Sequence, residues 1–394
     1  MQNKFRKDFP FFSSDKPLIY FDNAATTQKP QAVIDAISHF YSYQNAPVHR
    51  GIYSLAEQAT ELYEEARQKV ARYIGAFEDE VVFTKGTTES INFISATWAS
   101  HLQQGDEVIL TELEHHANIV PWIRLSQMHG IQLRYVPVNS DGTLHYEQYL
   151  SLLSSKTKLV SFTACSNALG TMVDIPFMIN HAHRVGAKVL VDAAQIVGRE
   201  KMDVHELNAD FLVFSSHKML GPTGIGVLFI ARELHEAVEP YQVGGGMVFE
   251  VDLYKATWLK PPRKYEAGTP AIAEAVGFGA AVDYIKHNVA LDVLRTHERT
   301  LSTKLYVALK SFSSVTVLSP SESHIVNFVS TRFHAHDIAA YVDQYGICVR
   351  AGNHCAQPLH KKLGVDSSVR VSFYLYNTEQ EVDTLISALE KLFV

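Results

Sequence analysis

Short, nearly continuous apolar segments alternate with stretches of helical periodicity between residues 80 and 230. Apolar strands separated by helices, such as the helical stretch at residues 177–185, are typical of a mainly parallel sheet covered on both faces. We therefore predict an α/β fold, and ligands of such sheets bind at the carboxyl ends of the strands. Six segments have the length and composition of buried strands: residues 80–84, 106–110, 158–163, 188–192, 211–214 and 226–230.

The pattern changes after the last of these strands. Residues 271–312 predict one long helix, and a chain of 394 residues is long enough for two domains. We predict a large domain over residues 14–285 and a smaller C-terminal α/β domain over residues 286–394, with residues 1–13 joined to it. The smaller domain would contain strands at 325–329, 347–350 and 369–373 and a final amphipathic helix at 379–392.

Composition and charge exclude several classes of protein. The net charge of −7 argues against nucleic-acid binding, and no apolar run is long enough to span a membrane. The segment Met1–Phe12 has no apolar signal core, so we interpret it as mature sequence. The chain has only three cysteines and no CxxC pair, which argues against a disulfide framework or a zinc site. We expect a cytoplasmic protein without a bound metal.

Polar residues follow the first two strands. Gly86, Thr87 and Thr88 stand where a strand turns into a helix, and this pattern favours either a phosphate cradle or an ordinary helix cap. His115 and His116 follow the next strand. They could bind a metal, stack on a planar ring or move protons, or simply begin a helix.

Further polar residues follow the later strands. Asp192 ends an apolar strand, with Gln195 three residues on, and a carboxylate there requires a cationic partner such as a protonated pyridine nitrogen, unless it caps a helix. Lys218 follows Ser215 and His217 and precedes a glycine-rich turn, where a lysine can form a Schiff base. A lone lysine would more commonly be a solvated surface charge.

One cysteine differs from the other two in its setting. Cys355 lies beside His354 on a loop marked by Gly, Asn and Pro, which favours a reactive thiol. Cys165 and Cys348 lie at or within apolar strands, and we interpret both as packing residues.

Together these signals match a known family. The chain resembles the class V, fold-type-I enzymes that depend on pyridoxal 5'-phosphate (PLP), specifically the type II cysteine desulfurases (SufS/CsdA-like), over nearly its whole length. The resemblance implies a mainly parallel seven-stranded sheet flanked by helices in the large domain. The short loop around Cys355 is typical of type II enzymes. The matching segments are Asn23–Thr26, Val48–Gly51, Gly86–Glu89, Glu114–Trp122, Ser166–Asn167, Asp192–Gln195, His217–Lys218, Gly221–Gly224, Glu266–Pro270, Arg350–Gly352, His354–Pro358 and Arg370.

The resemblance implies PLP as the cofactor, with Lys218 forming the Schiff base and later removing the α-proton of the substrate. His115 would stack on the ring as part of the catalytic machinery, and Asp192 would pair with the ring nitrogen. The family's homodimer would complete each site with a phosphate contact from Thr269 of the partner subunit. The other cofactor contacts would come from Thr87, Thr88, Gln195, Ser215 and His217.

The resemblance also implies the reaction. Asn167, Arg350 and Arg370 would bind L-cysteine, with Arg370 holding its α-carboxylate. Cys355 would accept the sulfur as a persulfide and leave L-alanine. A SufE- or SufU-like carrier would then take the sulfur for iron–sulfur clusters or other sulfur-containing cofactors. A selenocysteine lyase using the same site is the alternative within PLP chemistry, and a Cys/His hydrolase or an inactive scaffold would leave Lys218 unused.

Overall fold

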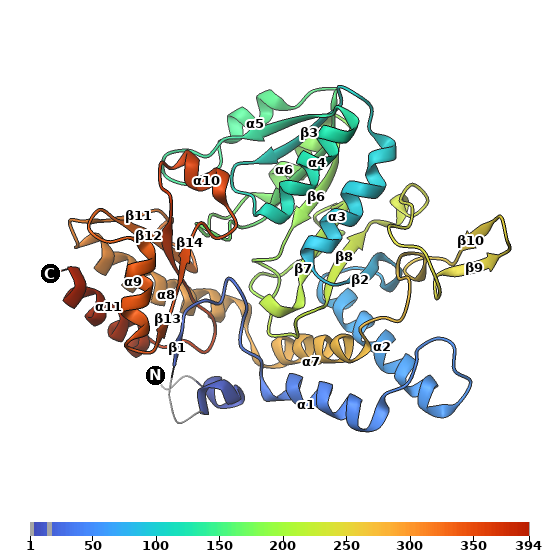
Figure 1. The fold of residues 1–394 in the computed structure, drawn as a ribbon, viewed down its shortest axis with the longest axis horizontal. Helices are drawn as coiled ribbons and strands as arrows, with labels where there is room; N and C mark the ends of the chain where they lie inside the picture. The colour runs from blue at the N-terminus through green and yellow to red at the C-terminus, as the bar shows by residue number, and fades with distance from the viewer. Residues whose placement is uncertain (1–3, 14–17, 394) are drawn as a thin grey trace.

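The computed structural model describes residues 4–13 and 18–393. Its largest element is a seven-stranded sheet with the strand order β2-β8-β7-β6-β5-β3-β4 (Figure 1). Residues 1–3, 14–17 and 394 of the predicted domains lie outside the described part of the chain. The strands of this sheet are β2 (Val81–Thr84), β3 (Glu107–Thr111), β4 (Gln132–Val136), β5 (Thr157–Thr163), β6 (Lys188–Asp192), β7 (Phe211–Ser215) and β8 (Gly226–Ile230).

The sheet is mainly parallel, as predicted, but β8 runs antiparallel to both of its neighbours, β2 and β7. The connection from Ser215 to Gly226 is too short for the crossover that a parallel pair requires, so the chain must reverse direction there. Strand β4 was not predicted. It lies at the edge of the sheet and is largely exposed, so its residues lack the continuous apolar pattern of a central strand.

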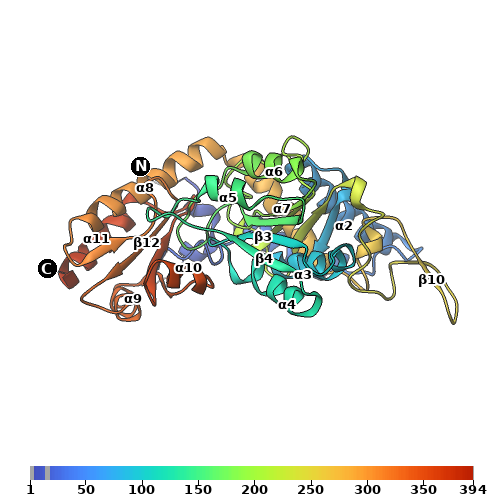
Figure 2. The same cartoon turned by 90° about the horizontal axis from the view of Figure 1, so that it is seen from above.

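Helices cover both faces of the sheet. Helices α3 and α4 lie on one face, and α6 and α7 lie on the other (Figure 2). The helices of this part are α1 (Gln31–His39), α2 (Ser54–Tyr73), α3 (Thr87–Thr97), α4 (Val120–His129), α5 (Tyr146–Leu152), α6 (Ile175–Arg184) and α7 (Ile272–Asn288).

The prediction of one long helix over residues 271–312 is wrong. The chain forms α7 and then α8 (Leu291–Lys310), with Val289 and Ala290 in extended conformation between them. Asn288 ends α7 by donating its side-chain amide to the carbonyl of Tyr284 at 2.9 Å. The break redirects the chain, because α7 packs in the core of the large sheet whereas Leu301, Leu305 and Leu309 of α8 pack in a second cluster.

The second cluster belongs to a four-stranded antiparallel sheet with the order β11-β12-β15-β14. The predicted strand at 347–350 is divided there: β13 leaves this sheet and pairs with β1, while β14 joins β15. No helix in the described residues could cross a membrane. The elements are β1 (Ile19–Tyr20), β11 (Val315–Val317), β12 (Ile325–Ser330), α9 (Ala335–Asp343), β13 (Ile347–Cys348), β14 (Arg350–Gly352), α10 (Gln357–Lys362), β15 (Ser368–Ser372) and α11 (Glu379–Phe393).

A two-stranded hairpin, β9 (Val248–Val251) and β10 (Ala256–Trp258), projects from the opposite end of the molecule (Figure 1). Between the hairpin and the small sheet, the carboxyl ends of β5, β6 and β7 approach β14 and β15. Side chains from both sheets therefore line one cavity.

Candidate active site

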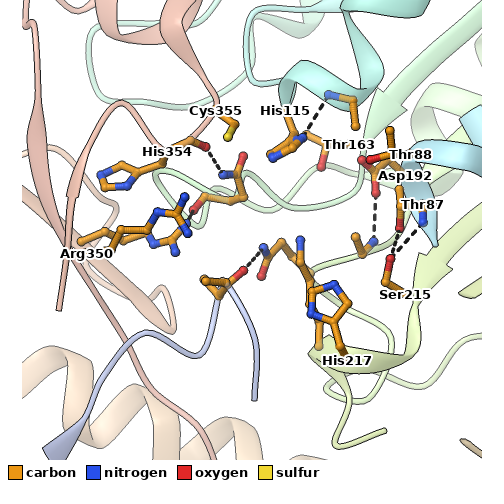
Figure 3. A pocket seen from close by; sticks show the side chains of 18 residues that line it. Thr87, Thr88, His115, Thr163, Asp192, Ser215, His217, Arg350, His354 and Cys355 are labelled. Atoms are coloured by element: carbon orange, nitrogen blue, oxygen red, sulfur yellow. Dashed lines mark hydrogen bonds between the residues drawn. The ribbon is translucent and has the colours of Figure 1, made fainter. Parts of the chain in front are cut away.

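A cavity of about 230 Å³ lies where the two sheets meet. Figure 3 shows Thr87 and Ser215 at one end and Arg350 and His354 at the other. The predicted site residues that line it are Thr87, Thr88, His115, Asn167, Asp192, Gln195, Ser215, His217, Lys218, Arg350, Cys355 and Arg370.

The first end of the cavity is built from a helix start and hydroxyl groups. Thr87 begins α3, and its backbone N–H donates to Ser215 Oγ at 2.9 Å, while the two hydroxyl oxygens lie 2.8 Å apart. The N-cap position is Gly86, at φ 148°, so Thr87 is not the cap. A helix start with hydroxyl donors attracts an anion such as a phosphate.

Asp192 and Gln195 lie in the middle of the cavity. Asp192 is 4% exposed, and its carboxylate accepts the backbone N–H of Ala194 at 3.0 Å. Burial raises the pKa of this carboxyl group, whereas the charge of Lys218 lowers it. Gln195 donates to the carbonyl of Ala24 at 2.9 Å, and its Oε1 has no hydrogen-bond partner among residues 4–13 and 18–393.

Lys218 is not a solvated surface charge. It ends a short 3-10 helix after β7, and part of its surface opens into the cavity. Burial lowers its pKa from 10.5 to about 8, although the carboxylate of Asp192 opposes that shift. The neutral, nucleophilic amine is therefore more accessible near neutral pH than it would be for a solvated lysine.

His115 is held as a neutral ring. Its Nδ1 accepts the backbone N–H of Ala117 at 3.0 Å, and burial together with Lys218 lowers its pKa to about 3. The metal hypothesis gains no support, because no cluster of three or more His, Cys, Asp or Glu side chains suited to a metal occurs in the described residues. A neutral imidazole at this position is suited to contact with a planar ring.

The role of Glu114, which precedes this histidine and fixes the turn in front of it, was not predicted from the sequence. Glu114 is fully buried and accepts hydrogen bonds from the side chains of Thr111 and Asn118 and the backbone of Thr163. Burial raises its pKa to about 8. The carboxyl group thus ties the turn before His115 to the end of β5. A glutamate beside two histidines was the available signal, but the partner on β5 becomes adjacent only in the folded chain.

The second end of the cavity carries two arginines. Arg350 and Arg370 are direct partners across the antiparallel strands β14 and β15. Arg370 donates Nη1 to the carbonyl of Asn167 at 2.9 Å and Nη2 to Asp22 at 2.8 Å, and its Nε has no partner in the described chain. Two cations placed opposite each other, one with an unused donor, favour a bound carboxylate.

Cys355 lies on a tight turn between β14 and α10. His354 and Cys355 both have positive φ, 51° and 56°, which is rare for residues other than glycine. The carbonyl of Cys355 accepts the backbone N–H of His116 at 2.7 Å, and the thiol lines the cavity. Cys165 is fully buried, with its pKa raised to about 12 by burial, and Cys348 is half-buried in β13.

Thr269 is the one predicted site residue that the structure places elsewhere. It is exposed and lines a separate cavity with Tyr63 and Glu266. Its loop is anchored by Glu266, whose carboxylate accepts bonds from Arg67 at 2.6 and 2.8 Å, from Tyr63 at 3.0 Å and from the backbone of Phe83 at 2.7 Å. Within one subunit Thr269 therefore does not join the main cavity.

The main cavity fits PLP. Its anion-binding end suits a phosphate, Asp192 suits a protonated ring nitrogen, and Lys218 supplies the amine. Five cavity atoms have no hydrogen-bond partner in the described residues, as expected of groups that serve a bound molecule: Asn167 Oδ1, Gln195 Oε1, His217 Nδ1, His354 Nδ1 and Arg370 Nε.

Comparisons with known families agree with this geometry. The model of the family "Aminotransferase class-V" matches residues 19–385. The chain is 44% identical to a probable cysteine desulfurase of Halalkalibacterium halodurans, over 99% of this chain and 97% of that protein. It is also 44% identical to a cysteine desulfurase of Synechococcus elongatus, over 98% of this chain, but it spans only 63% of that relative's length.

Solved structures give the same result. The cysteine desulfurase of Thermococcus onnurineus superposes with a TM-score of 0.95 at 38% identity, covering 98% of this chain and 97% of that one. The cysteine desulfurase CsdA of Escherichia coli superposes with a TM-score of 0.93 at 36% identity, covering 100% and 99%.

Proposed function

Because the chain belongs to the class-V aminotransferase family, with cysteine desulfurases as full-length relatives, we propose that it is a PLP-dependent cysteine desulfurase. The enzyme converts L-cysteine to L-alanine and receives the sulfur on Cys355. One observation carries the proposal: the Cys355 thiol, the Lys218 amine and the two arginines line the same cavity. The names of the relatives do not favour the selenocysteine lyase alternative.

The residues that line the cavity would hold the cofactor. Thr87, Ser215 and His217 would hold the phosphate, with Thr88 beside them at the start of α3. Asp192 would pair with the ring nitrogen, and Gln195 and His115 would contact the ring. When bound, PLP supplies an electron sink that stabilises negative charge at the substrate α-carbon.

The substrate is oriented by the arginine end of the cavity. Arg350 and the free Nε edge of Arg370 bind its α-carboxylate, and Asn167 lies beside them. Lys218 takes the α-proton, because its lowered pKa makes the neutral amine more accessible than in a solvated lysine. The neutral ring of His115 adds no charge to this step.

The sulfur-transfer step uses Cys355. Its thiolate attacks the substrate sulfur, so a sulfur–sulfur bond forms while the carbon–sulfur bond breaks. The electron pair of the broken bond goes to the β-carbon, which takes up a proton, and Lys218 returns a proton to the α-carbon. The products are L-alanine and a persulfide on Cys355. An acceptor protein of the SufE or SufU kind then takes the outer sulfur of this persulfide.

The experiment that tests this function is direct. The purified enzyme with L-cysteine alone should release about one alanine per site rapidly and then slow down, because the persulfide occupies the only thiol among the described residues that line the cavity. Mass spectrometry should place one added sulfur on the peptide containing Cys355, and Cys355→Ser should abolish it while the cofactor stays bound. Sulfur on Cys165 or Cys348 instead, or no alanine at all, would refute the proposal.

A homodimer is part of the proposal. Thr269 lies outside the main cavity of its own subunit, and the β9–β10 hairpin exposes large apolar side chains that a partner would cover. The exposed fractions are 74% for Phe249, 63% for Val251, 90% for Leu253 and 97% for Tyr254.

Mixing two inactive variants tests the shared site. Refolded mixtures of Lys218→Ala and Thr269→Ala subunits contain hybrids in which one site has both native residues. If Thr269 serves the partner's site, the mixture regains activity that neither variant shows alone. If each site is complete within one subunit, the Thr269→Ala protein is as active alone as in the mixture.

Two further assignments accompany this function. We propose a cytoplasmic location, because Cys165, Cys348 and Cys355 are all free thiols, as a reducing compartment would keep them. We also propose the division into a large domain at 14–285 and a small one at 286–394 with 1–13. The second hydrophobic cluster, which lies almost wholly within residues 286–394, supports the main division, whereas Phe9 packs in the cluster of the large sheet and Phe21 in that of the small one.

A further inference from the structure

The turn that carries Cys355 is held through three consecutive carbonyl groups. Each accepts a hydrogen bond from a different part of the chain, so the turn cannot rotate without breaking at least one of them. The three bonds are Asn167 Nδ2 to the His354 carbonyl at 2.7 Å, the His116 backbone N–H to the Cys355 carbonyl at 2.7 Å, and His360 Nδ1 to the Ala356 carbonyl at 3.0 Å.

Ser368 connects the two sides of this turn. Its buried hydroxyl lies 3.0 Å from His354 Nε2 and 2.8 Å from His360 Nε2. His354 precedes Cys355, and His360 holds the residue that follows it. Ser368 also lies two residues before Arg370 on β15, so both side chains leave the same face of the strand. One strand therefore holds both the carboxylate-binding arginine and the support of the sulfur acceptor.

The proton positions in this cluster follow from its partners. The Ala356 carbonyl can only accept, so His360 carries its proton on Nδ1 and accepts at Nε2. Ser368 therefore donates its one proton to His360, because its other acceptor, the Gly352 carbonyl, is 3.5 Å away. It follows that His354 donates from Nε2 to Ser368 and has a bare Nδ1.

The bare nitrogen of His354 has no hydrogen-bond partner in the described residues, and the side chain lines the cavity. Burial and the nearby Arg370 lower the pKa of His354 to about 2, so the ring stays neutral in this arrangement. The cluster thus presents a fixed tautomer beside the arginine end of the site.

The same cluster offsets backbone strain. His354 and Cys355 occupy the left-handed region consecutively, at φ 51° and 56°. Residues in this region carry conformational strain and persist only where their surroundings enforce them. Without Ser368, the two histidines lose their common partner and the strained turn loses its attachment to β15.

We propose that Ser368 is a positioning residue for sulfur transfer: through His354 and His360 it holds the strained turn that presents the Cys355 thiol to the substrate sulfur. This inference rests on the proposed desulfurase function. Ser368 acts through the two histidines and touches neither substrate nor cofactor. Its loss should therefore affect the transfer step and leave the binding of both largely unchanged.

The test compares Ser368→Ala with two matched variants. Ser368→Thr retains the hydroxyl group. Ser367→Ala removes the neighbouring hydroxyl group, which forms a 3.0 Å hydrogen bond with the exposed His334 and does not line the cavity. We expect kcat of Ser368→Ala for alanine formation to fall about 10- to 100-fold, the scale of a misplaced reacting group. KM for cysteine and the cofactor absorption band should stay close to wild type.

A second measurement needs no turnover. Hydrogen–deuterium exchange of the peptide 350–358 in the cofactor-bound enzyme should accelerate in Ser368→Ala and stay at the wild-type rate in Ser367→Ala. His360→Gln, which removes the imidazole bonds to Ser368 and to the Ala356 carbonyl but keeps the backbone bond between His360 and Ala356, should accelerate the same peptide. This variant serves the test if Ser368→Ala does not fold.

The outcomes distinguish the positioning role from the proposed function. If the wild-type enzyme forms no alanine, the proposed function fails, whereas the exchange result still reports on the turn. If the wild type is active but Ser368→Ala keeps its kcat and exchange pattern, the positioning role is wrong. A rise in KM with kcat unchanged would place Ser368 in substrate binding and overturn the proposal, as would failure of Ser368→Thr to restore kcat.

Discussion

Replacing Arg370 with lysine is expected to weaken the recognition of the substrate carboxylate while leaving the fold intact. Nη1 and Nη2 of Arg370 each donate a hydrogen bond, to Asn167 and Asp22, and Nε is the guanidinium nitrogen without a partner in the described chain, so we expect a ligand to bind at the Nε edge. A lysine keeps a positive charge beside the partly exposed carboxylate of Asp22. It cannot reproduce the planar fork that contacts three partners in different directions.

The expected size of the effect is that of a single hydrogen bond between the Nε edge and the substrate carboxylate. One charge-assisted hydrogen bond contributes about 1.5–3 kcal/mol, which corresponds to a decrease in kcat/KM of roughly 10- to 150-fold. This bond forms before the reaction begins, so most of the decrease should appear as a higher KM.

The assay measures alanine formation against cysteine concentration in the presence of a reductant, with cofactor absorption as the check on loading. Arg295→Lys is the matched control, because Arg295 is an exposed arginine that pairs with Glu200 at 3.3 Å. Cysteamine, which has no carboxylate, should react equally poorly with the wild type and with Arg370→Lys. An unchanged KM for cysteine, or an equal loss with cysteamine, would refute the assigned role.

Three further predictions concern the centre of the site and its support. Asp192→Asn should keep PLP but lose most activity, with a shift in the cofactor absorption band, and wild-type rates would mean that Asp192 only bonds Ala194. In the cofactor-free protein, the pKa of Lys218 is about 8 in the folded state and 10.5 in the unfolded state. Between pH 8 and 10.5 the unfolded state therefore binds more protons than the folded state. The free energy of unfolding should rise with pH across this range. Urea unfolding of Lys218→Met should show a flatter pH dependence there. Glu266→Leu should lower the free energy of unfolding by about 3–5 kcal/mol, because it leaves the fully buried Arg67 without its main partner, and a decrease below about 1 kcal/mol in urea would contradict this.

The position of the site was predictable because its residues follow strands. Thr87, Asp192 and Lys218 each come directly after an apolar segment, and carboxyl ends of neighbouring strands meet at one edge of a sheet. Their convergence in one cavity therefore follows from local pattern and topology alone. The reactive setting of Cys355 was also visible locally, because Gly, Asn and Pro mark a loop around it.

Other features could not be derived from local pattern. The edge strand β4 has no continuous apolar run, because one side of it faces solvent. The break between α7 and α8 lies within a sequence of helical character, and it occurs because the two halves pack in different cores.

The pattern of residues along the chain was enough to predict the fold class, the edge of the sheet where the cavity lies and the thiol that lines it. The position of Thr269 outside its own subunit's main cavity, and the contacts of Ser368 with His354 and His360, became visible only in the folded chain. Periodicity and strand ends act over a few residues and can be read along the chain. A hydroxyl group between two imidazoles depends on the side-chain positions of three elements, and those positions exist only after the strands have paired and packed.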